Sequence, residues 1–302
     1  MIARLPVMRR ASYLGAAVCV LGFFAWQFGA AISLRGTKTF MSNPEDGKVA
    51  HGSYTNNYFS LSYRLPQGWT AGEAGPDPSQ SGYYVLSTLV PKTKPNANIL
   101  IAAQDMFFDA YRSGDLQGGD LEDRARDFQQ AVSNVEGMSI DRDLTEEKAG
   151  DHLLYRVDYS GVGLFRARLA TEVRCHVVSL DVTTSDRELL ELLAGRLDSL
   201  SLAATRHAAS SPPPCVKGYA SADNVLHKVD PLSIGPKFVP IPVRIIVGAD
   251  GSVKHVHVIR ATEDQRRGIE DALYQWKFKP YEINGRPSPV ETGLVFKFTP
   301  DN

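Results

Sequence analysis

Few residues in this sequence have the types and spacing that metal or acid–base chemistry requires. His255 and His257 lie two positions apart, which places both on one face of a strand, as two ligands of a metal ion would lie. The stretch lacks a third ligand, so we interpret both as ordinary histidines of an exposed sheet face and predict no metal site. Four acidic residues between Asp141 and Glu147 are interpreted as a solvated loop rather than an acid/base pair.

The local signatures of common enzyme classes are absent. The sequence contains no GxSxG, HExxH, Walker A or GxGxxG pattern, so nucleophilic, zinc, phosphate and dinucleotide chemistries each lack their linear motif. We therefore predict a protein that is not an enzyme and needs no cofactor.

Composition narrows the remaining classes. The 302 residues allow about two domains, and 43% hydrophobic with 22% charged residues is typical of chains that bury ordinary cores. The 33 Lys and Arg against 34 Asp and Glu give a net charge of -1, which leaves no positive surplus for a phosphate backbone. Nucleic acid is therefore excluded as an expected partner.

The beginning of the chain predicts a membrane anchor. Residues 11–34 contain no charged residue and, as a helix, are long enough to cross the roughly 30 Å hydrocarbon core of a bilayer. Arg4, Arg9 and Arg10 precede them, which predicts that residues 1–10 remain in the cytoplasm. We predict a single-pass inner-membrane protein with most of its chain in the periplasm. A cleaved signal peptide, with residues 29–31 (GAA) as the cleavage site, is the alternative.

Export changes the expected state of the three cysteines. Cys19 falls within the apolar run, Cys175 falls in a strand pattern, and Cys215 directly follows three prolines. In an oxidising compartment Cys175 and Cys215 can pair, which would tether a linker to the preceding domain. A buried Cys175 with an unpaired Cys215 is an equal alternative.

The exported part divides into two predicted domains. Residues 35–53 are polar and are predicted to form a spacer. The two domains are predicted at residues 54–202 and 216–302, and the Pro-rich residues 203–215 are predicted to form the linker between them. In the first domain, apolar patterns predict two helices and several strands, at 59–65, 83–90, 99–107, 153–159, 165–170 and 172–182. The first helix begins at Leu121, and the second opens with Ser185 and Glu188 at capping-box spacing. Together they predict an antiparallel sheet covered by helices, an α+β fold.

That order of elements, with YFSLSYRLP at residues 58–66 followed by GW at 68–69, resembles the PsbP, Mog1 and DcrB class of α/β/α sandwiches. The resemblance implies a binding or assembly module for residues 54–202.

The last sixty residues predict a small sheet crossed by one helix. Strand patterns at 242–247 and 253–259 flank a GADG turn, and Thr262 and Gln265 have capping-box spacing before a helix with an apolar stripe. Residues 281–283, the turn residues Asn284 and Gly285, and residues 290–298 predict a second hairpin.

The motifs of this region resemble the C-terminal domain of TonB proteins. They are VRIIVGADGSV at 243–253, ALYQWKFKPY at 272–281, NGRP at 284–287 and FKF at 296–298. The resemblance implies structural roles for Gly251, Trp276, Pro280, Asn284 and Gly285. It also implies that the domain captures a short segment of an outer-membrane receptor by strand addition. The predicted anchor has no ionisable residue, which argues against coupling to a proton-driven motor.

We therefore predict a membrane-anchored envelope protein that recognises an extended peptide or envelope partner through its last strand. A last strand can leave backbone N–H and C=O groups free to pair with an incoming chain. The predicted partner-binding residues are Val290, Thr292, Leu294, Val295, Phe296, Lys297 and Phe298, with residues 294, 296 and 298 on one face and residues 295 and 297 on the other. The alternatives are a homodimer that covers this strand, a TonB-type energy transducer that drives transport, and an exported hydrolase without a linear motif.

Overall fold

The computed structural model describes residues 41–93, 96–108, 120–202, 212–231 and 240–296. The predicted anchor at 11–34 lies outside these ranges, as do Lys297 and Phe298. Within the described ranges, no helix is both long and apolar enough to cross a membrane.

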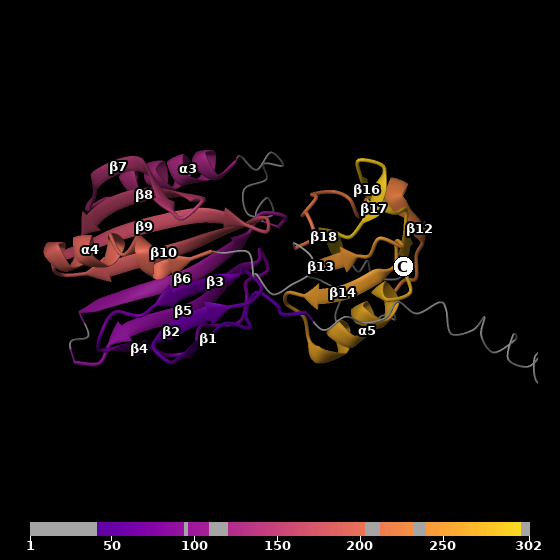
Figure 1. Cartoon of the computed structure of the whole chain (residues 1–302), viewed down its shortest axis with the longest axis horizontal. Helices are drawn as coiled ribbons and strands as arrows, with labels where there is room; N and C mark the ends of the chain where they lie inside the picture. The colour runs from indigo at the N-terminus through magenta and orange to yellow at the C-terminus, as the bar shows by residue number, and fades with distance from the viewer. Residues whose placement is uncertain (1–40, 94–95, 109–119, 203–211, 232–239, 297–302) are drawn as a thin grey trace, which may run out of the picture. The chain divides into compact units, whose positions relative to one another are not determined.

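The largest element is an antiparallel seven-stranded sheet in the order β4-β5-β6-β10-β9-β8-β7 (Figure 1). Its strands are β4 (Trp69–Ala71), β5 (Tyr83–Pro91), β6 (Ala97–Asp105), β7 (Met138–Ala149), β8 (His152–Gly161), β9 (Leu164–Val173) and β10 (His176–Thr184). Alternating burial along β6, with Ile99 and Ile101 fully buried, reflects the period-2 pattern that predicted this strand.

A second, four-stranded sheet has the order β1-β2-β3-β11. It consists of β1 (Lys48–Ala50), β2 (Ser53–Asn56), β3 (Leu61–Arg64) and the short β11 (Leu200–Ser201). Tyr54, Leu61 and Tyr63 are buried with Ile99, Ile101 and other residues of the large sheet in one hydrophobic cluster, the first cluster. The two sheets therefore share one core.

Two helices complete this part of the chain. Helix α3 (Leu121–Ser133) is capped by Asp120 and packs beside β7 and β8, and α4 (Arg187–Ala194) packs beside β9 and β10 (Figure 1). The buried residues of α4, Leu190 and Leu193, belong to the first cluster. One face of the seven-stranded sheet is therefore covered by the four-stranded sheet and α4 together, whereas the sequence predicted a cover of helices.

The remaining residues form a smaller, separate hydrophobic cluster, the second cluster. A three-stranded sheet in the order β14-β13-β18 contains β13 (Ile241–Val247), β14 (Val253–Val258) and β18 (Val290–Phe296), and helix α5 (Glu263–Leu273) packs beside β14. Two small pairs join it: β12 (Val225–His227) with β15 (Lys277–Phe278), and β16 (Tyr281–Ile283) with β17 (Arg286–Ser288). The short 3-10 turns η1 (Leu197–Ser199) and η2 (Ala222–Asn224) complete the described elements.

The antiparallel α+β class is confirmed, but several elements differ from their prediction. Residues 141–147 lie in β7 instead of a solvated loop. Their backbone pairs with β8, and their charged side chains are compatible with an edge strand because most of them are exposed or half-buried. The predicted strand at 172–182 is interrupted by a turn at Arg174 and Cys175. The predicted spacer contains β1, and residues 281–283 pair with β17 rather than with β18.

Candidate partner-binding edge

The predicted partner-binding residues that the structure describes lie along β18, and their side chains alternate as expected: Val290, Thr292, Leu294, Val295 and Phe296. Leu294 and Phe296 pack on the second cluster, and Val295 packs on the first. Val290 and Thr292 are fully buried. The strand therefore lies between the two hydrophobic clusters with one face toward each.

Strand β13 occupies one edge of β18 along its whole length, from Val247 opposite Val290 to Ile241 opposite Phe296. The other edge is partly occupied by the chain itself. The N–H of Glu291 donates to Pro214 O at 2.9 Å, and the N–H of Val216 donates to Glu291 O at 2.8 Å. This contact is a parallel bridge between Cys215 and Glu291, so the Pro-rich segment covers the beginning of the edge.

The later part of the same edge has no such cover among the described residues. In an antiparallel ladder, backbone groups point alternately toward and away from a given neighbour. Because the N–H and C=O of Glu291 point away from β13, those of Gly293 and Val295 point the same way. Pro242 lies opposite Val295 and has no N–H to donate, which agrees with this alternation. Within the described ranges, neither Gly293 nor Val295 has a backbone hydrogen bond on the side that faces away from β13.

Below the edge lies a buried cluster of charged side chains centred on Arg244 of β13, whose exposed fraction is 2%. Its Nη1 donates to Asp105 Oδ2 at 2.8 Å, its Nε to Glu291 Oε1 at 3.2 Å, and its Nη2 to the carbonyl of Arg174 at 3.0 Å. Burial opposes its charge, but Asp105, Tyr58 and Glu291 raise the pKa of Arg244 above its usual value. The guanidinium therefore stays protonated.

Glu291 holds a second guanidinium in the same cluster. Arg174 donates to Glu291 Oε2 from Nε at 3.1 Å and from Nη2 at 2.8 Å, and the Tyr58 hydroxyl donates to Oε1 at 2.7 Å. Burial alone would raise the pKa of Glu291, but Arg244 and Arg174 lower it below the usual value. Two carboxylates, on Asp105 and Glu291, thus balance two guanidiniums.

His176 completes this cluster and is fully buried. Its Nδ1 lies 2.9 Å from the carbonyl of Arg174, which can only accept, so Nδ1 carries the proton. Its Nε2 lies 3.5 Å from Arg244 Nη1 and 3.5 Å from Asp105 Oδ2. Burial and the nearby Arg244 lower the pKa of His176 well below its usual value. The ring is therefore neutral, and its approach to Asp105 is not an ion pair.

Cys175 directly follows Arg174 of the buried cluster and forms a disulfide with Cys215, and the two Cα atoms are 6.2 Å apart. Of the two states that the sequence left open, the structure has the paired one. Arg174 and Cys175 both have positive φ, 52° and 54°, in the two-residue turn between β9 and β10. Non-glycine residues rarely adopt this conformation, and here one is held by the disulfide and the other by Glu291.

The residues implied as structural by the TonB resemblance lie in the second cluster or in turns. Gly251 has φ 76°, and a Cβ there would come within 2.1 Å of the carbonyl oxygen of Phe278. Trp276 is buried and donates from Nε1 to Val229 O at 2.7 Å. Asn284 and Gly285, with φ 52° and 73°, form the turn between β16 and β17, and Pro280 separates β15 from β16.

The two histidines of β14 contact separate acceptors. His255 Nε2 lies 3.0 Å from Asn43 Oδ1, and His257 Nε2 lies 3.0 Å from Glu45 Oε1. The prediction of an exposed face is wrong for His257, which is 4% exposed, because residues of the predicted spacer pack along β14 and supply these acceptors.

Sequence reasoning missed the buried cluster. Asp105 ends β6, Arg174 and His176 lie at the turn between β9 and β10, and Arg244 lies within β13. These three segments are far apart in the chain, and each residue falls within an otherwise apolar strand pattern. The only available signal was a charged residue at a position that the period-2 pattern makes buried, as at Arg244 and Glu291.

Comparison with solved structures shows a likeness over about half of the chain. The chain is similar to the solution structure of cyanobacterial PsbP (CyanoP) from Synechocystis sp. PCC 6803, with 16% sequence identity and a TM-score of 0.36 over 51% of this chain and 95% of that one. No protein-family model matches the sequence, the TonB family included, and no curated protein matches it.

Proposed function

We propose that this protein is a membrane-anchored, non-enzymatic component of the cell envelope that binds an extended peptide segment by strand addition. The observation that supports this proposal is the outward direction of the backbone groups of Gly293 and Val295, which have no partner among the described residues. Segment 214–216 already pairs with Glu291, which lies two positions before Gly293 on the same edge. An incoming strand would continue that column of hydrogen bonds. The resemblance of residues 242–298 to TonB C-terminal domains agrees with this mode of binding.

The geometry limits what such a segment can be. The face of β18 that carries Glu291, Gly293 and Val295 packs against other parts of the chain, and a Cβ at Gly293 would lie 2.8 Å from Phe108. A bound strand can therefore contact the edge but gains little from side-chain pockets on that face. We expect main-chain pairing to supply most of the affinity, and a preference for segments with small side chains toward Phe107 and Phe108.

The test combines capture in intact cells with measurement on the full-length chain. Crosslinking identifies the captured segment, which is then synthesised with and without N-methyl groups on alternate backbone nitrogens. Fluorescence anisotropy measures binding of both peptides to the wild-type chain, to Val295→Pro and to Val295→Ala. The proline removes the outward N–H and spares the β13 ladder, whereas alanine keeps the N–H and shortens the side chain.

We expect the Val295→Pro chain to lose about tenfold in affinity, because it lacks one edge hydrogen bond. The N-methylated peptide should lose at least as much, because it lacks several N–H donors. Val295→Ala should stay within about threefold. A folded Val295→Pro chain that binds the peptide as tightly as the wild type would place recognition on another surface. If crosslinking captures only a second copy of the chain, the edge is a homodimer contact.

A further inference from the structure

A polar cavity of about 620 Å³ lies on the four-stranded sheet. The register of the sheet brings its lining together: Ser53 of β2 is opposite Arg64 of β3, and Ser62 of β3 is opposite Ser201 of β11. Ser62 and Arg64 are two apart and share a face, the one opposite to buried Tyr63. We call this cavity the serine–arginine pocket.

The other wall of the pocket comes from the segment that follows α4. Arg196 and Ser199 line it there. Arg196 forms a hydrogen bond with the Tyr63 hydroxyl, but its Nε is buried and has no hydrogen-bond partner in the described part of the chain.

The charges of the pocket are not balanced by its own carboxylate. Among the described residues, the side chain of Arg64 has neither a hydrogen bond nor an ion-pair partner. Glu191 lines the rim, but its oxygens accept from Arg142 at 3.1 Å and from Arg156 at 3.0 Å. Burial would raise the pKa of Glu191, but those two arginines lower it. The negative charge of Glu191 is thus engaged outside the pocket, so Arg64 and Arg196 give the lining a positive surplus.

We propose that the serine–arginine pocket binds a phosphate group. A guanidinium presents paired N–H donors that match two phosphate oxygens, and each serine hydroxyl can donate to a further oxygen. A carboxylate, with two oxygens, would leave most of these donors unused. The cavity is larger than a phosphate ion, so it has room for the alcohol part of a phosphate ester. The ligand is therefore a soluble phosphomonoester or the phosphate of a lipid headgroup.

The experiment uses the full-length chain in zwitterionic nanodiscs and isothermal titration calorimetry. Inorganic phosphate is titrated first, followed by glycerol 3-phosphate and dihexanoyl phosphatidylglycerol as the monoester and diester arms. The variants are Arg64→Gln, Arg196→Gln and the matched control Arg267→Gln, an exposed arginine of α5 whose loss changes the net charge equally. Val295→Pro is included because the pocket does not depend on strand addition.

We expect saturable phosphate binding that weakens at least tenfold in Arg64→Gln and in Arg196→Gln and stays within twofold in Arg267→Gln and Val295→Pro. Tighter binding of the monoester identifies a soluble ligand, and tighter binding of the diester identifies a lipid headgroup. If Arg196→Gln disturbs folding, Arg64→Gln still tests the proposal, because Arg64 is exposed and its substitution should leave the fold intact. Absence of saturable phosphate binding, or equal affinities for Arg64→Gln and Arg267→Gln, would overturn the proposal.

Discussion

Glu291 is the residue on which the buried cluster depends, because it accepts hydrogen bonds from Arg174, Arg244 and Tyr58. Glu291→Gln leaves the buried Arg244 and the partly buried Arg174 with one carboxylate between them. We expect the free energy of unfolding to fall by about 3–5 kcal/mol, as for other broken buried ion pairs. Urea unfolding followed by circular dichroism measures the change. Glu282→Gln, in the exposed turn strand β16, is the control and should change it by less than about 0.5 kcal/mol. Equal losses in the two variants would contradict this role.

His176 gives the buried cluster a predictable response to pH. Its folded pKa lies well below 6.5, so below pH 6.5 the unfolded chain binds a proton that the folded chain does not. Its contribution to stability is therefore complete above pH 6.5 and declines as the pH falls, by at most about 1.4 kcal/mol per pH unit.

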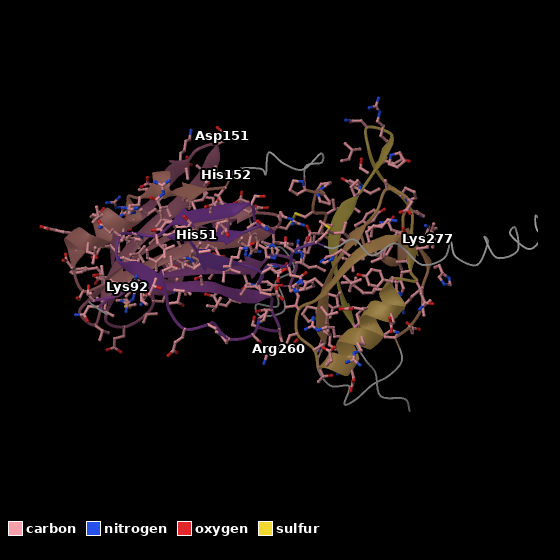
Figure 2. The ribbon with its side chains drawn as sticks, turned by 60° about the horizontal axis from the view of Figure 1, so that its bottom comes forward. His51, Lys92, Asp151, His152, Arg260 and Lys277 are labelled. Carbon is pink, nitrogen blue, oxygen red and sulfur yellow. A yellow bond between two sulfur atoms is a disulfide. The ribbon has the colours of Figure 1, made fainter. Side chains whose placement is uncertain are left out.

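Urea unfolding at pH 7, 6 and 5 tests this linkage. His176→Asn should flatten the decline over that range, whereas His51→Asn, at an exposed turn labelled in Figure 2, should leave it unchanged. An identical pH dependence in the wild type and His176→Asn would show that another group titrates.

At the scale of elements, helix α5 begins as its sequence predicts. Thr262 and Gln265 form both bonds of a capping box. We expect Thr262→Ala to lower the free energy of unfolding by about 1 kcal/mol, because the N–H of Gln265 loses its acceptor. Ser221→Ala is the matched control, since Ser221 precedes a 3-10 turn without a side-chain cap bond. Similar unfolding midpoints for the two variants would argue against the cap.

The elements that the sequence predicts well are those specified by neighbouring residues. The cap of α5, the GADG hairpin and the strand at Ile99 each depend on residues within a few positions. The turn at Arg174 and Cys175 could not be predicted, because neither residue favours positive φ and distant groups hold them there. The bridge between Cys215 and Glu291 was hidden for the same reason: nothing near residue 215 indicates a partner 76 positions later.

At the scale of the whole molecule, the disulfide and the buried cluster join the two predicted domains. Replacing both Cys175 and Cys215 with alanine frees a loop of about 40 residues in the unfolded chain, which predicts a loss of about 4 kcal/mol on the chain-entropy model. Thermal unfolding of the double variant and the wild type under oxidising conditions measures this loss. With reductant present, the two proteins should have equal midpoints. A difference that persists after reduction would mean that alanine perturbs packing rather than cross-linking.

The same contacts predict how the domains unfold. The separate apolar patterns of the sequence favour two independent domains, but Arg244 and Glu291 of one contact Asp105 and Arg174 of the other. Unfolding of either predicted domain alone would leave charged side chains of the other without their partners. We therefore expect one calorimetric transition for the disulfide-bonded chain. Two resolved transitions would restore the independent-domain prediction.

The position of Glu291 near the end of the chain also bears on synthesis. Arg174 and Arg244 emerge from the ribosome well before the carboxylate that neutralises both of them, and Cys215 emerges before the strand that its segment will cover. A nascent chain that stops before Val290 therefore has the guanidiniums of Arg174 and Arg244 with only the Asp105 carboxylate to balance them. We expect such a product to leave this part of its core open and to be more sensitive to proteases than the complete chain. The two cores thus become closed together, once β18 supplies Glu291.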